Sequence, residues 1–323
     1  MYDVVTFGEG FVRLSPPGRL RLEQTHSLQL YVGGAELAVA AACSRLGLAA
    51  AWVSRVPGHP LGRMVVNRAR EHGVDVSRVI WADEGRVPLC FVEFGAMPRA
   101  GLAIWDDGDS GLSRMQAQDV DWSLLTGAKL LHVGADTPAL NAPVAEATIA
   151  AFTEAKTRGC KVSFHLRCLR RRGGPDAAGL CESLVQRADL LIADPADAQD
   201  VFGTDRVPAD AARQLKDRFA LDAVAIPAAT PEGSRRGAWT GIALGAQLHT
   251  DRAYDLEIVD TGGVADAFAA GIIHGYLRGD LEAGLRYANA LAAIAHTHPG
   301  ELCYFTRREA ADQLDAPGPT IQR

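Results

Sequence analysis

The sequence of 323 residues predicts one α/β domain, covering residues 1–323, with a mainly parallel central sheet. Short apolar runs such as Tyr2–Gly8 alternate with segments of helical periodicity such as Ala35–Leu46. This alternation is typical of parallel sheets that are covered by helices on both faces. Gly47 and Gly73 follow the first two helical segments, as glycines commonly do at helix ends. A hydrophobic content of 48% with 22% charged residues is that of an ordinary globular protein.

The remaining elements are expected in the same alternating order, each from an apolar run or a helical pattern. A strand at Ala50–Arg55 precedes a helix at Pro60–His72. The later strand and helix pairs are Leu130–Val133 with Ala142–Arg158, Lys161–His165 with Pro175–Arg187, Leu190–Ala193 with Pro195–Phe202, and, after a strand at Ala223–Ile226, Ile258–Val259 with Asp266–Leu277.

Two regions, at about residues 11–32 and 87–105, interrupt the alternation. They contain short strand-like pieces that are separated by Gly and Pro, with no helical segment between them: FVRLS, LQLYV, LCFVEFG and LAIW. Such pieces predict a small antiparallel sheet that is inserted into the α/β body, placed to act as a lid or an interface.

Charge and composition argue against several classes of partner. The net charge of −6 disfavours nucleic acid. The six cysteines are scattered without a CxxC pair, which indicates reduced thiols and not a disulfide framework. The first residues read as a strand and not as a signal peptide, and no apolar run is long enough to span a bilayer. We therefore expect a cytoplasmic protein with no nucleic-acid or membrane partner.

Several common catalytic motifs are absent. There is no GxxxxGK[ST] loop, and no GxGxxG, because Arg13 stands where the third glycine would fall. His296 and His298 are two residues apart and indicate a polar turn more readily than a metal site, so no metal ligands are predicted. The GDSG at Gly108–Gly111 favours a loop over a protease nucleophile, since no triad can be assembled around it.

The stretch Ile258–Ile272, IVDTGGVADAFAAGI, carries the strongest chemical signal. A strand-like run leads through a glycine turn into a helix that places Asp266 near its start. The N-terminus of a helix presents unpaired N–H groups and the positive end of its dipole, so it can bind an anion. A carboxylate there can take the proton of a hydroxyl while the amides stabilise a transferring phosphoryl group. The alternative is an aspartate that only caps the helix.

The segment DTGGVADAFAAGIIHGYL resembles the C-terminal signature of the ribokinase-like (PfkB) carbohydrate kinases, DTxGAGDxF. The sequence GGAE at Gly33–Glu36, followed by Ser54-Arg55 and PLGR, is similar to the N-terminal signature of the same family. VTFGEG, RLSPPG, LRLEQ, HVGADTPAL, EIVD and HTHPGE resemble the 2-keto-3-deoxygluconate kinase branch. The resemblance extends from Tyr2 to about Leu314 and therefore covers nearly the whole chain.

The resemblance implies a ribokinase-like Rossmann-type sandwich with a β-sheet lid over the sugar, and a homodimer that pairs through its lids. It implies transfer of the γ-phosphate of ATP, with Mg²⁺, to a hydroxyl of a sugar or an acidic sugar such as 2-keto-3-deoxygluconate. Asp266 takes the position of the catalytic base, and Gly263, Val264 and Ala265 that of the anion hole. The other implied positions are Gly33, Gly34, Ala38, Trp105 and Arg167 for the sugar, and Asp194 and Thr261 for the nucleotide.

The chain departs from the family pattern at the anion hole, where GVAD replaces GAGD or GGGD. If the second motif glycine has a positive φ, Ala265 at that position costs about 1–2 kcal/mol. The branched Val264 would also intrude on the space of a phosphate oxygen. Because the loss of one anion-hole donor typically lowers the rate roughly 100- to 1000-fold, misaligned amides would matter.

The sugar and nucleotide sides depart as well. Ala38 replaces the usual Asn, and Cys90 and Trp105 replace expected lid tyrosines. The family's FDLNYR appears as FHLRCL, which places His165 and Arg167 at the Asp and Asn positions. The remaining changes are Asp194-Pro195 in place of Asn-Glu, and a basic run, Arg167, Arg170, Arg171 and Arg172, which suits a carboxylate or phosphate but is more often a solvated loop.

Two functions therefore remain open. The first is an active sugar kinase with a shifted substrate, such as an acidic sugar that reaches Arg167. The second is a catalytically impaired or inactive relative that keeps the fold for a binding, regulatory or structural role.

Overall fold

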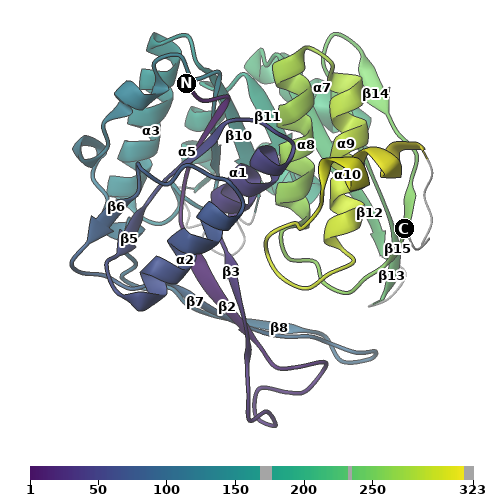
Figure 1. Cartoon of the computed structure of the whole chain (residues 1–323). Coiled ribbons are helices and arrows are strands. Elements are labelled where there is room, and N and C mark those ends of the chain that lie inside the picture. Colours follow the sequence, from purple (N-terminus) through teal and green to yellow (C-terminus); the bar gives the residue numbers. More distant parts are fainter. Residues whose placement is uncertain (168–176, 232–234, 316–323) are drawn as a thin grey trace.

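The computed structural model describes residues 1–167, 177–231 and 235–315, which form a large central sheet between two layers of helices and a small sheet that projects from the body (Figure 1). The strands of the central sheet, in their order across it, are β14 (Leu248–Thr250), β13 (Arg236–Leu244), β12 (Ala223–Pro231), β11 (Leu190–Ala193), β10 (Lys161–Leu166), β9 (Leu130–Gly134), β1 (Val4–Phe7) and β4 (Ala50–Val53), and β15 (Tyr254–Glu257) pairs with β13.

The central sheet is mainly parallel, as the sequence predicts. All neighbouring pairs from β4 to β12 are parallel, and β13 pairs antiparallel with β12, β14 and β15. Every residue of β1, β4, β9 and β11 is buried, because strands that are covered on both faces need apolar side chains on both.

Two hydrophobic clusters fill the two faces of the sheet. Val4 belongs to one cluster and Val5 to the other, because successive side chains of a strand point to opposite faces. The first cluster includes α1 (Ala35–Arg45), α2 (Pro60–Glu71), α8 (Val264–Arg278), α9 (Leu281–Ala295) and α10 (Arg307–Asp315). The second includes α3 (Ala142–Thr157), α5 (Ala177–Val185), α6 (Pro195–Phe202), α7 (Pro208–Phe219) and three 3₁₀ turns at Leu112–Arg114, Ala117–Asp119 and Trp122–Leu125.

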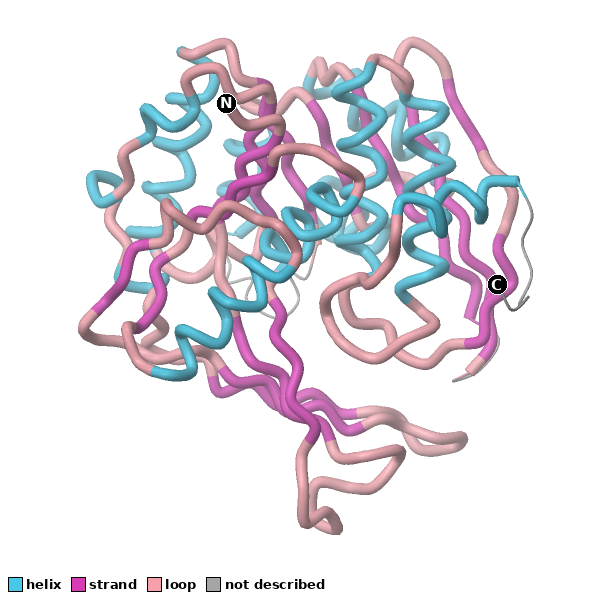
Figure 2. The backbone as a smooth tube through the Cα atoms, viewed as in Figure 1, coloured by secondary structure: helices cyan, strands magenta, loops and turns pink. Residues whose placement is uncertain are grey.

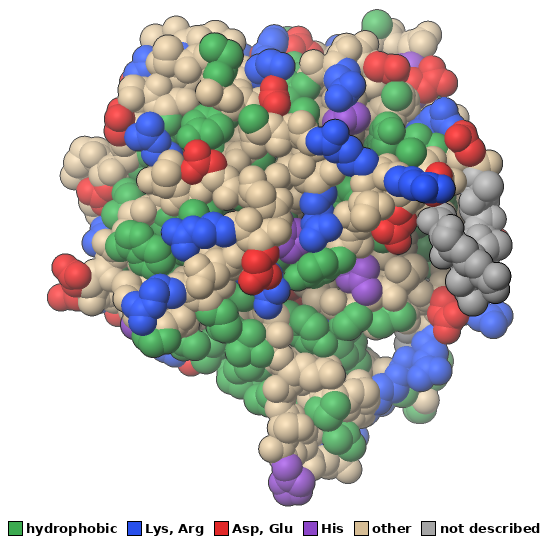
Figure 3. Space-filling model, viewed as in Figure 1, with side chains coloured by type: hydrophobic (Ala, Val, Ile, Leu, Met, Phe, Trp, Pro, Cys, Tyr) green, Lys and Arg blue, Asp and Glu red, His purple; other side chains and the backbone are tan. Residues whose placement is uncertain are grey.

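The small sheet has the strand order β3 (Gln29–Gly33), β2 (Phe11–Ser15), β7 (Leu89–Glu93) and β8 (Leu102–Asp106). The expectation that it is antiparallel is wrong at its centre, where β2 and β7 pair in parallel. The physical reason is that β2 and β7 are the first strands of two separate hairpins, and both hairpins leave the body in the same direction. Figure 2 shows all four strands extending away from the body. In Figure 3 the small sheet stands clear of the body, and a cleft of about 850 Å³ lies between them.

Most expected elements are present with shifted ends, but the expectation of a strand at Ile258–Val259 is wrong, because the strand there is β15, which ends at Glu257. Elements that were not expected include α7, α9, α10, β13 and β14. The expected strand Ala50–Arg55 is divided into β4 and β5 (Arg55–Pro57), and β5 pairs in parallel with β6 (Ile80–Ala82). The last predicted helix begins two residues earlier than expected, at Val264. Of the segment predicted as a helix at 175–187, the first two residues lie outside the described residues. No helix in the described part of the chain combines the length and apolar character needed to cross a membrane. Cys43, Cys160, Cys181 and Cys303 are buried free thiols.

Candidate active site

Two cavities border the first turn of α8, on the side of the central sheet where its parallel strands end. The sugar-side cavity has a volume of about 260 Å³ and is lined by Glu9, Phe11, Gly34, Ala35, Glu36, Cys90, Val92, Ala103, Trp105, Asp136, Thr137, Arg167, Asp266 and Glu301. The second cavity, of about 460 Å³, is lined by Asp194, Pro195, Ala196, Pro227, Ala229, Trp239, Thr261, Val264, Ala265 and His296. In open α/β sheets, ligands bind in crevices outside the carboxyl ends of the strands.

The N-terminus of α8 is built to leave its amides available. Gly263 occupies the capping position with φ +67°, and no side chain caps the helix. The first N–H groups of a helix have no intrahelical acceptor and carry the positive end of the dipole. A Cβ on Gly263 would lie 1.9 Å from the carbonyl oxygen of Glu301, so this turn requires glycine. The alternative in which Asp266 caps the helix is wrong, because Asp266 is the third residue of α8.

The structure does not show the backbone strain considered for Ala265. Val264 and Ala265 both lie inside α8, and among the described residues Asp109 and Ala220 are the non-glycine positions with positive φ. The left-handed conformation falls on Gly263, which the sequence retains. The side chain of Val264 is buried, and both Val264 and Ala265 line the second cavity.

Asp266 combines burial with a charged partner. Its exposed fraction is 3%, and its carboxylate accepts a hydrogen bond from the Arg167 guanidinium in an ion pair. Burial raises the pKa of Asp266 above its usual value, Arg167 opposes this effect and the nearby Asp136 adds to it. A carboxylate with a raised pKa, at the mouth of a cavity and beside free helix amides, is suited to accept a proton from a hydroxyl.

Arg167 follows β10 directly, so the carboxyl end of that strand aims it at α8. Arg170, Arg171 and Arg172 lie outside the described residues. His165, two residues earlier, is buried in the sheet with its ring 6.2 Å from that of His132 and lines neither cavity. Burial lowers the pKa of His165 well below its usual value, so it is a neutral core residue.

The predicted sugar-side residues separate into two groups. Gly34, Trp105, Arg167 and Asp266 line the same cavity, where Trp105 packs edge-to-face on Phe11 at 5.0 Å between ring centroids. Gly33 and Ala38 do not line it. Ala38 is 2% exposed and belongs to the hydrophobic core, because its position on α1 faces the body.

Of the predicted nucleotide-side residues, Asp194 and Thr261 both line the second cavity. Asp194 is also the N-cap of α6, where its Oδ1 accepts hydrogen bonds from the backbone N–H groups of Ala196 and Asp197. Trp239 and His296 form an aromatic wall with ring centroids 5.4 Å apart. Within the described ranges, no group of three or more His, Cys, Asp or Glu side chains could hold a metal ion.

Glu36 is a site residue that the sequence analysis did not assign. Its Oε1 accepts hydrogen bonds from the Gly134 N–H (2.9 Å) and the Thr137 hydroxyl (2.7 Å). Burial raises the pKa of Glu36 to about 8 despite these two bonds. A Cβ on Gly8 would lie 2.0 Å from Glu36 Oε2, so the side chain occupies the space that this glycine leaves. A single acid within the apolar helix AELAVAAA was the signal that could have identified it.

The fold and these two cavities define a class, that of α/β proteins with ligand crevices at the carboxyl ends of parallel strands and a helix N-terminus that suits an anion. The model of the pfkB family carbohydrate kinases matches residues 1–302. The chain is 31% identical over 323 residues to a 2-dehydro-3-deoxygalactonokinase of Haloferax volcanii, covering 99% of both chains.

Solved structures agree with this family match. A 2-dehydro-3-deoxygluconokinase of Thermotoga maritima superposes with a TM-score of 0.93 at 29% identity, over 97% of this chain and 98% of that one. A PfkB family carbohydrate kinase of Listeria grayi gives a TM-score of 0.92 at 28% identity, over 97% and 99% of the two chains. The chain therefore belongs to the PfkB family of carbohydrate kinases, and its fold is ribokinase-like.

Proposed function

We propose that this protein transfers the γ-phosphate of ATP to a hydroxyl of a 2-keto-3-deoxy sugar acid, with Asp266 as the general base. The observation that carries the proposal is that one turn of α8 borders both cavities. Asp266 lines the sugar-side cavity, and Val264 and Ala265 line the other. An acceptor hydroxyl beside Asp266 and a phosphoryl group over the α8 amides would then be adjacent.

The roles of the protein groups follow from this placement. Asp266 takes the proton of the attacking hydroxyl, which its raised pKa favours. The N–H groups of Gly263, Val264 and Ala265 stabilise negative charge on the transferring phosphoryl group. Phosphoryl transfer needs mainly such positioning and electrostatic stabilisation.

The proposed substrate class rests on Arg167 and on the relatives. Arg167 is the cationic side chain that lines the sugar-side cavity within the described residues, and a guanidinium suits a substrate carboxylate. The relatives at 31% and 29% identity are named for 2-dehydro-3-deoxy sugar acids. Gly34 and Trp105 would contact the sugar from the body and from the small sheet respectively.

The second cavity is the proposed nucleotide site, with Asp194 and Thr261 on its wall. Mg²⁺ binds chiefly to substrate phosphates and water, with one or two carboxylates, so it does not require a cage of protein ligands. Asp194 is the carboxylate that would face it, with Mg²⁺ supplying charge neutralisation on the phosphates when bound.

We also propose that the small sheet is a lid and a dimer interface. The register aligns Leu30, Leu14, Phe91 and Ile104 in one row across its outer face. Leu30 is 44% exposed and Ile104 47%, so the described part of the chain leaves these two apolar side chains of the sheet open to solvent. Ile104→Glu should shift the protein from dimer to monomer by light scattering. Leu61→Glu, at a similarly exposed apolar residue of α2, should leave the dimer intact, and a wild-type monomer would refute the interface.

The activity is tested by ADP release from ATP–Mg²⁺ with 2-keto-3-deoxygluconate and 2-keto-3-deoxygalactonate as acceptors. Turnover that Asp266→Asn abolishes supports the proposal. A protein that shows no turnover, while ATP or a sugar acid still raises its melting temperature, would instead be an impaired relative that kept ligand binding. This alternative rests on the ion pair between Arg167 and Asp266, because it engages the carboxylate that would act as the base.

A further inference from the structure

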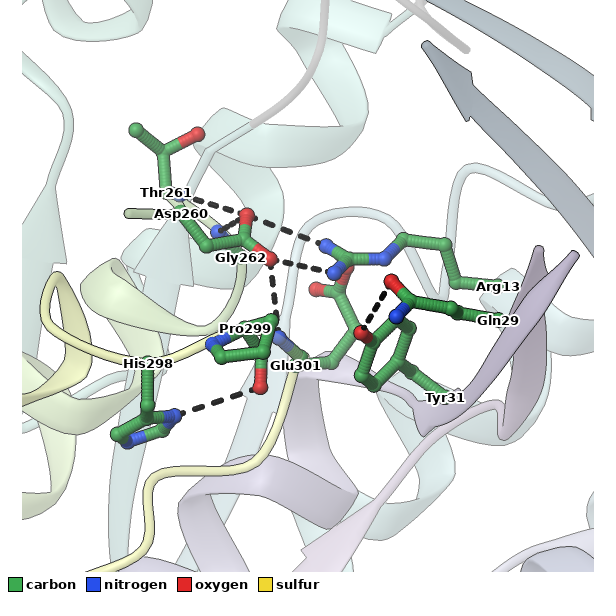
Figure 4. Close-up of polar contacts among 10 residues, drawn as sticks. Arg13, Gln29, Tyr31, Asp260, Thr261, Gly262, His298, Pro299 and Glu301 are labelled. Atoms are coloured by element: carbon green, nitrogen blue, oxygen red, sulfur yellow. Dashed lines mark hydrogen bonds and ion pairs between the residues drawn. The ribbon is translucent and has the colours of Figure 1, made fainter. Parts of the chain in front are cut away.

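A buried arginine joins the small sheet to the turn that precedes α8. Arg13 lies on β2 and is 2% exposed. Its Nη1 donates to Glu301 Oε1 at 2.7 Å and to Asp260 Oδ1 at 3.3 Å, and its Nη2 donates to Asp260 Oδ2 (Figure 4). The guanidinium also lies 4.7 Å from the ring centroid of Tyr31, on the neighbouring strand β3.

Asp260 connects Arg13 to the backbone of two loops. Its Oδ1 accepts hydrogen bonds from the N–H groups of Thr261 (2.7 Å) and Gly262 (3.0 Å). Its Oδ2 accepts one from the N–H of Gly300 (2.9 Å), in the loop that follows α9. Burial alone would raise the pKa of Asp260. Arg13 and the backbone hydrogen bonds instead hold this pKa below its usual value, so Asp260 remains a charged acceptor. One carboxylate thus ties the turn before α8 to the loop after α9.

The glycine turn is packed directly against this network. A Cβ on Gly262 would lie 2.7 Å from Arg13 Nη1 and 2.8 Å from Glu301 Oε1. The neighbouring Gly263, at the capping position of α8, is pressed against the backbone of Glu301. The path of the turn, and with it the direction of the first amides of α8, is therefore set by Arg13, Asp260 and Glu301.

We propose that Arg13 is a positioning residue for phosphoryl transfer, which acts through Asp260 and Glu301 to hold the first turn of α8 in register with the small sheet. This inference rests on the proposed kinase activity. Arg13 reaches no reacting group, since it lines neither cavity at the α8 turn. It links the strands that roof the sugar-side cavity to the amides that would hold the phosphoryl group. A guanidinium is suited to this link because it can bind two carboxylates at once.

The test compares Arg13→Gln and Arg13→Lys with Arg45→Ala. Arg45 donates to His72 Nδ1 and to the Phe305 carbonyl and lines neither cavity, so its loss reports the cost of deleting a partly buried arginine. For Arg13→Gln we expect kcat to fall roughly 100-fold, as for a lost anion-hole donor, with the KM of the sugar changed by less than about threefold. Arg13→Lys keeps the buried charge and should fold even where Gln does not, with an intermediate kcat. Arg45→Ala should lower the melting temperature and leave kcat unchanged.

Two further measurements separate positioning from stability. Millimolar guanidinium should restore part of the kcat of Arg13→Ala, and sodium chloride at equal ionic strength should not. Amide hydrogen exchange in peptides that span residues 260–265 and 299–302 should be about tenfold faster in Arg13→Gln, with exchange in α3 unchanged. A wild-type kcat in Arg13→Gln, or amide exchange in that variant that rises equally throughout the chain, would overturn the inference. If the wild type lacks kinase activity, the proposed function fails, and the local exchange alone decides whether Arg13 positions the turn.

Discussion

Arg167 and Asp266, which are 99 residues apart in the sequence, form an ion pair on the wall of the sugar-side cavity. The pair joins the end of β10 to the first turn of α8. The resemblance to the family's FDLNYR motif places Arg167 at an asparagine position, so we expect this contact to be particular to this chain. Its consequence is that the proposed base and the proposed carboxylate-binding group begin the reaction bound to each other. A substrate carboxylate would bind Arg167 in place of Asp266, and the Asp266 carboxylate would then be available as the base.

Replacement of the proposed base should strongly reduce turnover. Asp266→Asn keeps the shape of the side chain but removes the proton acceptor, so kcat should fall roughly 100- to 10,000-fold. ATP should still raise the melting temperature, because the second cavity is unchanged. Asp255→Asn, at an exposed position of β15, is the matched control and should retain full activity. An Asp266→Asn enzyme with more than about a tenth of wild-type kcat would remove Asp266 from the mechanism.

Arg167→Gln should change both binding and pH dependence. Loss of a charged hydrogen bond to a carboxylate is worth about 1.5–3 kcal/mol, so the KM of a sugar acid should rise roughly 10- to 100-fold. Arg167 lowers the pKa of Asp266, and its removal should therefore raise that pKa further. The acidic limb of the kcat/KM profile should move to higher pH, because the base is then protonated over a wider range. A limb that stays in place would contradict the assignment of that limb to Asp266.

Glu36→Gln should alter the pH dependence of stability. The unfolded chain releases this proton near pH 4.5, whereas the folded protein holds it up to a pH of about 8. The folded state thus binds more protons between these values, so the stability that Glu36 contributes is complete below about pH 4.5 and is lost as the pH rises to about 8. The free energy of unfolding of Glu36→Gln, relative to wild type, should improve with pH by on the order of 4 kcal/mol. Glu71→Gln, at an exposed position at the end of α2, is the matched control for the loss of a glutamate charge.

Restoring the family glycines should not improve catalysis. Val264 and Ala265 already have helical conformations, and Gly263 already holds the left-handed position. Val264→Gly and Ala265→Gly should therefore each change kcat by less than about threefold. Ala265→Gly should cost about 0.5–1 kcal/mol of stability, because glycine weakens a helix. Val264→Gly should cost more, because it also removes a buried side chain. An increase in kcat above about tenfold would show that the side chain of Val264 obstructs the phosphate site.

The fold was predictable because its signals are local. The apolar runs that became β1, β9 and β11 and the glycine before α8 are visible in short segments of sequence. The parallel pairing of β2 with β7 was not predictable from the strand-like pieces alone, because register between distant segments leaves no local pattern.

The candidate site was predictable only in part. Asp266 stood out through its motif, whereas Ala38 was assigned to the sugar by position in that motif and is in fact a core residue. Arg13 and Glu301 escaped notice because each is an ordinary charged residue until tertiary structure buries it against Asp260. The burial that raises the pKa of Glu36 likewise arises only when α1 meets β9 and Gly8 leaves room for its carboxylate.

The parallel pair at the centre of the small sheet has a consequence for how the chain acquires its shape. Val12 pairs with Leu89, so neither hairpin can complete that sheet by itself. Joining segments so far apart in the sequence costs loop-closure entropy, and such non-local pairing is typical of slower folding. The roof of the sugar-side cavity needs both hairpins, because Phe11 comes from the first and Trp105 from the second, so damage to either hairpin opens the same pocket.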